Sequence, residues 1–318
     1  MFINGKWSID QHLEQPTDHN GAFVRQVSEF RSWITPDGQA GPTGEGGFAA
    51  EPDRYHLFVA LSCPWASRTL ITRAIKGLDR IVSLSIVEPE IPEEGWQFGP
   101  LTHEGEHGFA GLTHLRQVYE RADPSFTGRV TVPVLWDKKR ATIVSNESAE
   151  IMRMFNDGFG TLANSVFDLY PVDLRAVIDE INEWIYPTFN NGVYRAGFAA
   201  TQYAYDEAVA EVFSTLEALE ARLASGGPFL FGERCTEADI RLFVTLVRFD
   251  VAYYSLFKCN LRHLTDYGHV SEYLQRVLDI PGVRSTVCFD HIKRGYHSIK
   301  AVNPTGIVSI GPAALPDN

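Results

Sequence analysis

Basic residues are scarce in this sequence. Its 318 residues include 28 lysines and arginines against 40 aspartates and glutamates, which gives a formal net charge of −12. Proteins that bind nucleic acid usually carry a basic patch, and proteins that dock on anionic membranes carry clusters of lysine and arginine. The acidic balance therefore argues against nucleic acid and against membrane surfaces as partners.

Cysteine and long apolar runs are scarce as well. The four cysteines, at positions 63, 235, 259 and 288, are too few for a disulfide scaffold. They form no C-x-x-C pair and have no spacing typical of a metal site. No run approaches the ~20 apolar residues of a membrane helix, and the first residues lack the basic and then apolar pattern of a secretory signal. These absences predict a cytoplasmic protein without a bound metal.

The apolar content that is present suits two folded domains. Hydrophobic residues make up 44% of the chain, and its length fits about two domains. Residues 1–53 are expected to be an irregular extension. Residues 54–165 predict an α/β domain with an insertion at 88–128, because strand-like apolar runs alternate with helical spacing. These runs lie at 55–61, 81–87, 130–136 and 142–144, with helices expected after Pro64, over 112–122 and over 147–155.

The rest of the chain, residues 166–318, predicts an all-helical domain that ends in an extended tail from Ala301. Apolar residues recur there at helical spacing, for example from Leu174 to Ile185 and from Tyr205 to Leu223. Thr236 to Asp239 has the form of a helix N-cap signature.

Cys63 is the sharpest chemical candidate. It lies between an expected strand and an expected helix, and Pro64 suits the first helical turn. Amides and the dipole at a helix N-terminus favour the thiolate and lower the pKa of a cysteine. The alternative is a buried structural cysteine. Ala66 stands where a dithiol oxidoreductase has its second cysteine, so a mixed disulfide at Cys63 must be resolved by an outside thiol.

Two further elements follow the same line of reasoning. If the Val132–Pro133 bond is cis, the backbone of Val132 is free to pair with an extended peptide, although cis is a minority state for X–Pro bonds. Glu147 and Ser148, at an expected helix start, suit the ammonium and the carboxylate of an amino acid. Plain helix capping is the alternative for this pair.

Two stretches match known binding motifs, but their surroundings argue against a zinc site and a phosphate-binding loop. His103 to His107 spells H-E-x-x-H, but that zinc motif needs a helix, and the surrounding glycines predict a polar loop. The Gly-rich stretch 44–47 follows no strand and opens no helix, which argues against a phosphate loop.

Several stretches together resemble the Xi-class glutathione transferases, the glutathionyl-hydroquinone reductases, over essentially the whole chain. The most specific is the Cys-Pro-Trp-Ala turn, which separates this class from dithiol enzymes and from transferases that use serine or tyrosine. The chain departs from many relatives in having Ser67, where they have histidine. The matching stretches are LSCPWA at 61–66, GRVTVPVLWD at 128–137, IVSNES at 143–148, NNGVY at 190–194, TEADIR at 236–241 and NPTG at 303–306.

The resemblance implies a thioredoxin-like domain with a cis Pro133, an all-helical C-terminal domain and a homodimer. It also implies roles for individual residues. Cys63 is the implied nucleophile, Tyr194 the acid/base residue, and Tyr253 and Tyr296 favour the Cys63 thiolate. The sequence by itself gives these three tyrosines only ordinary core positions. The implied glutathione-binding residues are Trp96, Arg129, Val130, Thr131, Val132, Glu147 and Ser148.

The activity that the resemblance implies is reduction of glutathionyl-hydroquinones, with glutathione as co-substrate and no bound cofactor. Two alternatives stay open at this point. A monothiol transferase or dehydroascorbate reductase would use the same cysteine, and a glutathione-binding protein would use it without turnover.

Overall fold

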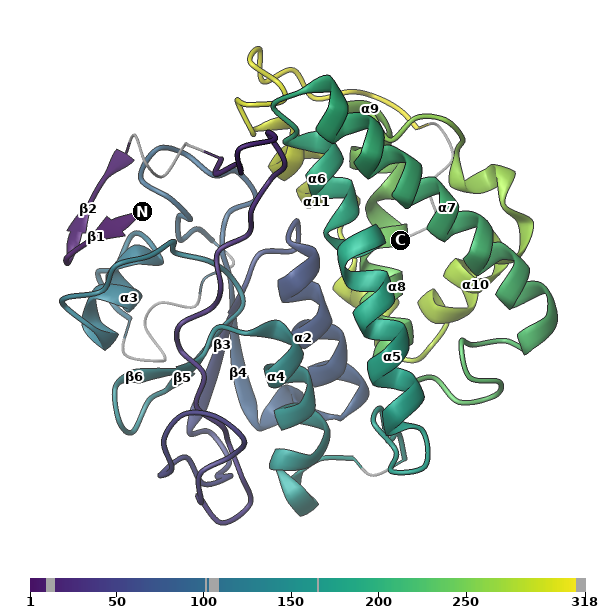
Figure 1. The fold of residues 1–318 in the computed structure, drawn as a ribbon. Helices are drawn as coiled ribbons and strands as arrows, with labels where there is room; N and C mark the ends of the chain where they lie inside the picture. Colours follow the sequence, from purple (N-terminus) through teal and green to yellow (C-terminus); the bar gives the residue numbers. More distant parts are fainter. Residues whose placement is uncertain (10–14, 101, 103–108, 165, 313–318) are drawn as a thin grey trace. The chain divides into compact units, whose positions relative to one another are not determined.

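The computed structural model describes residues 1–9, 15–100, 102, 109–164 and 166–312, and the chain divides into two compact units (Figure 1). The first, here called the N-terminal unit, comprises Met1–Glu14 and Gln26–Phe167. The second, the helical unit, comprises Gln15–Arg25 and Asp168–Asn318. The N-terminal extension is therefore divided between the two units.

A four-stranded mixed sheet forms the centre of the N-terminal unit. Its strand order is β4-β3-β5-β6, with β3 (Tyr55–Val59) parallel to β4 (Val82–Ile86) and antiparallel to β5 (Val134–Asp137). Strand β6 (Thr142–Ser145) pairs with β5 as an antiparallel hairpin. Every residue of β3 is buried, as expected for a central strand covered on both faces. The predicted α/β layer is confirmed.

Helices cover this sheet. Helix α2 (Pro64–Ile75) connects the parallel strands β3 and β4 and packs against β3, and α4 (Ser148–Arg153) lies beside α2 (Figure 1). Helix α3 (Arg116–Ala122) packs against β6 and begins four residues later than the expected residue 112. Three short segments complete the unit: η1 (Leu78–Arg80), η2 (Met154–Gly158) and η3 (Gly160–Leu162).

Strand β5 is shorter than expected. The sequence predicts a strand over 130–136, but pairing with β3 begins at Val134, opposite Phe58. Pro133 cannot donate a hydrogen bond to a neighbouring strand, so the pairing starts only after it. The Val132–Pro133 bond is cis, as the resemblance implied.

The expectation that residues 1–53 are irregular is wrong at the N-terminus. Strands β1 (Phe2–Ile3) and β2 (Lys6–Trp7) form an antiparallel hairpin. Its turn, Asn4-Gly5, has positive φ at both residues, 48° and 74°, which is the geometry that Asn-Gly favours in two-residue hairpins. The Phe2 N–H donates to the Gly128 carbonyl over 2.9 Å and ties this hairpin to the rest of the unit.

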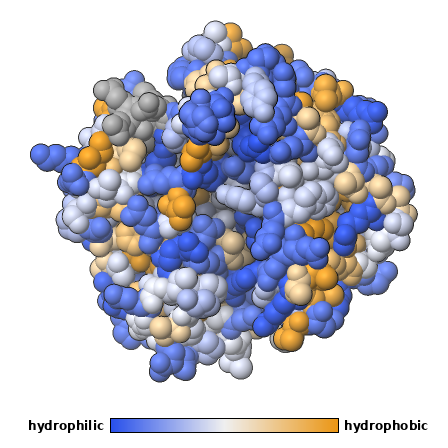
Figure 2. Space-filling view, viewed as in Figure 1, coloured by the Kyte–Doolittle hydropathy of each residue, from blue (hydrophilic) through white to orange (hydrophobic). Residues whose placement is uncertain are grey.

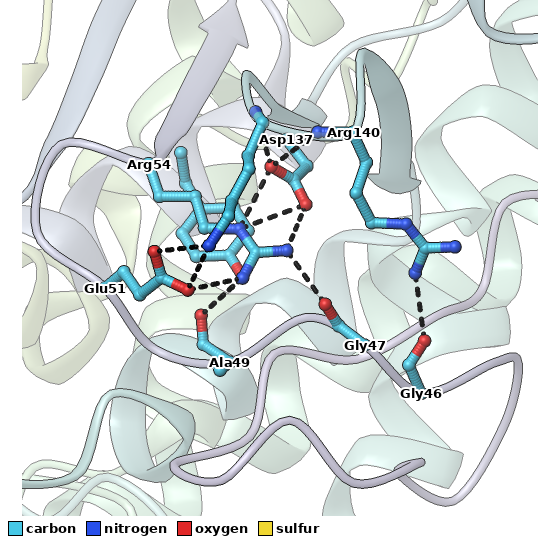
Figure 3. Close-up of polar contacts among 9 residues, drawn as sticks. Gly46, Gly47, Ala49, Glu51, Arg54, Asp137 and Arg140 are labelled. Atoms are coloured by element: carbon cyan, nitrogen blue, oxygen red, sulfur yellow. Dashed lines mark hydrogen bonds and ion pairs between the residues drawn. The ribbon is translucent and has the colours of Figure 1, made fainter.

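A buried ion pair fastens the later part of the extension to the sheet (Figure 3). The Arg54 guanidinium donates to both carboxylate oxygens of Asp137, with Nη2–Oδ2 at 2.5 Å, and the Asp137 side chain is fully buried. Arg54 also donates to the carbonyls of Gly47 and Ala49 and to the Glu51 carboxylate. The guanidinium therefore holds the segment 47–51 against the end of β5.

The helical unit confirms the all-helical fold class predicted for the C-terminal domain. Helix α8 (Glu237–Arg248) begins at the predicted N-cap, where the Thr236 N–H donates to Asp239 Oδ2 over 2.8 Å. Three short α-helices were not predicted: α6 (Gly192–Gly197), α9 (Tyr254–Leu256) and α11 (Phe289–His297). The other elements are α5 (Arg175–Ile185), η4 (Tyr186–Asn190), α7 (Gln202–Gly226), η5 (Phe249–Tyr253), η6 (Leu264–Asp266), α10 (Gly268–Leu278) and η7 (Arg284–Thr286).

The surface in Figure 2 is mainly polar, with apolar residues scattered among polar ones. In the part of the chain that the structure describes, no helix combines the length and the apolar composition needed to span a bilayer.

Candidate active site

Cys63 caps helix α2. Its backbone is extended (φ −81°, ψ 122°), Pro64 is the first helical residue, and the Cys63 N–H donates to the Ala60 carbonyl over 3.0 Å. The thiol is half-buried, and its Sγ donates to the Val132 carbonyl at 3.6 Å. The structure thus brings together two of the residues singled out in the sequence, and the Val132 backbone lies within reach of a molecule bound to the sulfur.

The other cysteines have different surroundings. Burial raises the pKa of Cys259 to about 12, and burial together with Asp239 raises the pKa of Cys235 well above its usual range. Both thiols are therefore held in the unreactive protonated form. Cys288 is half-buried like Cys63 and is the N-cap residue of α11 in the helical unit. None of the four cysteines, all of which lie in the described part of the chain, forms a disulfide.

Glu147 caps helix α4, which begins at Ser148, one residue later than expected. Its carboxylate accepts hydrogen bonds from the Ala149 N–H at 3.2 Å and from the Ser28 hydroxyl at 3.0 Å. Capping and ligand binding are not exclusive here, because each carboxylate oxygen can accept more than one hydrogen bond.

Ser148 lies beside a buried arginine that the sequence analysis did not single out. Arg68, on α2, is 1% exposed, and its Nη1 donates to the Ser148 hydroxyl at 3.5 Å. Its guanidinium also stacks over the Trp65 ring at 4.5 Å. Arg68 therefore links the helix that Cys63 caps to the start of α4 and brings positive charge to it. A sequence signal existed, because Arg68 lies one helical turn after Pro64.

A second buried residue joins the remaining predicted contacts. The Tyr119 hydroxyl donates to the Thr131 carbonyl at 2.9 Å and accepts from the Thr131 N–H and the Asn146 amide. It ties the backbone just before Val132 to the residue just before Glu147. Burial raises the pKa of Tyr119, so this hydroxyl stays protonated and able to donate.

Three other predicted glutathione-binding residues belong to the same unit, but no side-chain hydrogen bond described above joins them to Cys63 or Val132. Val130 and Trp96 are buried in the same apolar core as Val132, and the Trp96 carbonyl accepts from the Leu115 N–H at 2.9 Å. Arg129 is anchored through its backbone N–H, which donates to Gln26 Oε1 at 3.3 Å.

The helical unit brings its three predicted tyrosines into one cluster. The Tyr194 and Tyr296 hydroxyl oxygens are 2.6 Å apart, and those of Tyr253 and Tyr296 are 2.8 Å apart. Tyr194 lies on α6, Tyr253 ends the π-helical segment η5, and Tyr296 lies near the end of α11. All three are at most 9% exposed. The three hydroxyls form one hydrogen-bonded chain with Tyr296 in the middle.

Burial keeps two of these three hydroxyls protonated. It raises the pKa of Tyr253 and of Tyr296 well above 10, and nearby Arg248 offsets only part of that effect. Arg248 is itself 2% exposed, at the end of α8. A chain of neutral phenols can donate a proton and pass the hydrogen bond along, which is the behaviour required of a general acid.

Nothing in the described part of the chain suggests a metal centre, since no group of three or more His, Cys, Asp or Glu residues there is arranged to hold an ion. The H-E-x-x-H stretch at 103–107 lies outside the described residues.

Comparisons with known proteins show which family this chain resembles over almost its whole length. Residues 62–157 match the family "Glutathione S-transferase, N-terminal domain", and residues 202–276 match "Glutathione S-transferase, C-terminal domain". The chain is 51% identical to glutathionyl-hydroquinone reductase YqjG of Escherichia coli (98% of this chain, 95% of that protein). It is 46% identical to glutathionyl-hydroquinone reductase PcpF of Sphingobium chlorophenolicum (98% and 96%).

Solved structures show the same likeness. The glutathione-bound structure of YqjG superposes with a TM-score of 0.88 at 50% identity, covering 98% of this chain and 95% of that one. The Xi glutathione transferase of Phanerochaete chrysosporium superposes with a TM-score of 0.87 at 44% identity, covering 94% and 95%.

Proposed function

Because the chain belongs to the Xi class of the glutathione transferase family, we propose that it reduces glutathionyl-hydroquinones to hydroquinones with glutathione as the reductant. The observation that carries the proposal is the single thiol at the start of α2. Cys63 has the Val132 carbonyl beside it, and the buried Ala66 occupies the position of a second cysteine. A site of this kind forms a mixed disulfide and depends on an external thiol to resolve it.

In the first half of the reaction, the Cys63 thiolate attacks the sulfur of the glutathionyl-hydroquinone. An S–S bond forms and the bond between sulfur and the aromatic carbon breaks. The carbon takes the bonding electrons together with a proton from Tyr194, and the hydroquinone leaves. General acid help of this kind typically contributes 10²–10⁴-fold.

In the second half, a glutathione thiolate attacks the glutathione sulfur of the mixed disulfide. Oxidised glutathione leaves and Cys63 returns as a thiolate. The proton released from the incoming glutathione restores the Tyr194 hydroxyl. The sum converts one glutathionyl-hydroquinone and one glutathione into hydroquinone and oxidised glutathione. The kinetics should be ping-pong.

The glutathione site that we propose is built around α4 and the residues before Pro133. Val132 pairs with the cysteinyl backbone of glutathione, and Arg129, Val130 and Thr131 line the peptide. Glu147 and Ser148 bind the γ-glutamyl end, with Arg68 adding positive charge beside Ser148. Trp96 covers the bound peptide. This arrangement gives an anionic ligand local positive charge on an acidic protein.

The proposed roles of Tyr253 and Tyr296 follow from their hydrogen bonds. Tyr296 contacts both of the other hydroxyls, so it can stabilise the Tyr194 phenolate once its proton has left. Both tyrosines are proposed to favour the Cys63 thiolate as well.

Product analysis tests this function. The protein is incubated with a glutathionyl-hydroquinone and glutathione, and the hydroquinone and oxidised glutathione are measured in equal amounts if the proposal is right. Faster turnover of a small mixed disulfide or of dehydroascorbate would indicate a monothiol transferase instead. A stable glutathione adduct on Cys63, detected by mass spectrometry and not displaced by excess glutathione, would indicate binding without turnover.

The class also supports a cytoplasmic homodimer that needs no bound cofactor. Light scattering should then give a particle of twice the chain mass, and activity should survive exhaustive dialysis against a chelator.

A further inference from the structure

Arg25, in the N-terminal extension, lies on the face of Tyr194. Its guanidinium carbon is 4.6 Å from the centre of the Tyr194 ring. Its Nε donates to the Asn191 side-chain oxygen at 2.8 Å. Asn191 is the N-cap of α6, and its carbonyl accepts from the Tyr194 N–H. Arg25 thus contacts both the ring and the first turn of the helix that presents it.

The extension is held in place around this contact by several independent interactions. The Ala200 N–H donates to the Gly21 carbonyl at 2.9 Å, and the Thr201 hydroxyl donates to the Asn20 carbonyl at 2.8 Å. The Phe23 ring packs on Phe198 with centroids 5.3 Å apart.

The turn before this segment is specified locally. Asp18 accepts from the N–H groups of Asn20 and Ala22, and Gly21 has φ 82°, where a Cβ would lie 2.7 Å from Thr201. The extension therefore has a defined path in the helical unit, and that path ends with Arg25 over Tyr194.

A cation on the face of a phenol changes its chemistry. The ring attracts the guanidinium, and the attraction increases when the phenol becomes a phenolate, because a negative charge replaces a quadrupole. Burial acts in the opposite direction, since it disfavours the anion. Among the described residues, Arg248 and the three tyrosines themselves act on the pKa values of Tyr253 and Tyr296, and Arg25 lies over the ring of Tyr194.

We propose that Arg25 is a positioning residue for Tyr194, which fixes the ring through α6 and stabilises the phenolate formed when the proton moves to the substrate carbon. This inference rests on the proposed function, in which Tyr194 is the proton donor. It gives the N-terminal extension an indirect part in catalysis, in which Arg25 acts through Tyr194 and need not contact the substrate.

The test compares Arg25→Gln and Arg25→Lys in two backgrounds, wild type and Tyr194→Phe. In the wild-type background, Arg25→Gln should lower kcat about tenfold, leave the KM for glutathione unchanged, and move the alkaline limb of the kcat profile to higher pH. Arg25→Lys keeps the charge and should restore the pH profile, although it lacks the planar group that stacks on the ring.

Arg175→Gln is the matched control. The Arg175 guanidinium lies 5.0 Å from the centre of the Tyr170 ring in the same unit, so this variant removes an Arg–Tyr contact outside the cluster. Its kcat and pH profile should equal those of the wild type.

The two proposals fail in different ways. If Tyr194→Phe alone leaves kcat unchanged, the proton-donor role of Tyr194 is wrong. If Tyr194→Phe lowers kcat but Arg25→Gln lowers it by the same factor in both backgrounds, or leaves the alkaline limb in place, Arg25 acts only on folding and the inference is overturned. If Arg25→Gln does not fold, Arg25→Met replaces it as the neutral variant. An alkaline limb at higher pH in Arg25→Met but not in Arg25→Lys supports the inference, and the same limb in both variants overturns it.

Discussion

The two units hold their reactive groups in opposite surroundings. In the N-terminal unit, Cys63 and Glu147 are the N-cap residues of helices α2 and α4 and are half-buried. In the helical unit, Tyr194, Tyr253 and Tyr296 lie inside the core. A nucleophile needs access and the free amides of a helix start, whereas a proton donor must stay neutral until it is used, which burial ensures. The difference therefore matches the two tasks proposed for the units.

The local structure of the two units differs in the same way. Regular strands and helices position Cys63, so its place follows from the strand-to-helix turn. In the helical unit, the π-helical segments η4 and η5 lie directly beside the tyrosines: η4 ends four residues before Tyr194, and η5 ends at Tyr253. A π-helical turn changes the direction of the side chains that follow it, and such turns are frequent at functional sites.

The largest effect on activity is expected for Cys63→Ser, which removes the proposed nucleophile. If the N-terminal unit supplies the nucleophile, this variant should lose more than about 10³-fold of glutathionyl-hydroquinone reduction, measured as the steady-state rate at saturating glutathione. Cys288→Ser is the matched control, because Cys288 is also a half-buried cysteine at a helix N-cap, and serine is a favourable N-cap residue. Substantial activity in Cys63→Ser would contradict the assignment.

The next largest effect concerns the ion pair that holds the extension to the sheet. Asp137→Ala leaves the buried Arg54 guanidinium without its main partner, and breaking a buried pair in this way costs about 3–5 kcal/mol. Urea unfolding monitored by circular dichroism measures the loss. Asp173→Ala breaks a pair whose side chains are 63% and 51% exposed, with Arg234, and is expected to leave the unfolding midpoint in place. Equal midpoints for the two variants would show that Arg54 is stabilised without Asp137.

A smaller loss is expected from the helical unit. Tyr194→Phe keeps the ring beneath Arg25 but removes the proton, so turnover should fall about 10²-fold while the KM for glutathione is unchanged. Tyr205→Phe provides the control, because the Tyr205 hydroxyl donates to the Lys258 carbonyl at the surface. If Tyr194→Phe instead raises the KM for glutathione and leaves turnover unchanged, Tyr194 takes part in binding and not in proton transfer.

The N-terminal unit was the more predictable of the two. An all-apolar run followed by Cys63-Pro64 indicates a strand that ends where a helix begins, and the structure has this arrangement. The Asn4-Gly5 hairpin was missed although its signal is a strong one. Arg68 and Tyr119 were missed because their importance depends on partners 80 and 12 residues away, and no local pattern reports such contacts.

The tyrosine cluster could not be derived from the residues themselves. Its members lie 102 and 43 residues apart along the chain, and only the packing of α6, η5 and α11 brings them together. Helical periodicity identifies a buried face but not which buried hydroxyls meet. The resemblance named these residues, and the hydrogen-bonded chain supplies a physical reason for grouping them.

The burial that separates the two units also predicts a pH dependence for the helical one. An exposed tyrosine in the unfolded chain loses its proton near pH 10, whereas burial raises the pKa of Tyr253 and Tyr296 well above 10 in the folded chain. Above pH 10 the folded state therefore binds more protons than the unfolded state. The free energy of unfolding then falls as pH rises, by up to about 1.4 kcal/mol per pH unit for each tyrosine.

Urea unfolding of Tyr253→Phe between pH 9 and 11 should show a shallower decline in the free energy of unfolding than the wild type, because one of these groups is gone. Slopes rather than absolute stabilities are compared, since the variant also loses a hydrogen bond at every pH. Parallel slopes would mean that Tyr253 ionises alike in the folded and unfolded chains, and the contrast between a buried proton donor and an accessible nucleophile would then rest on Tyr194 and Tyr296 alone.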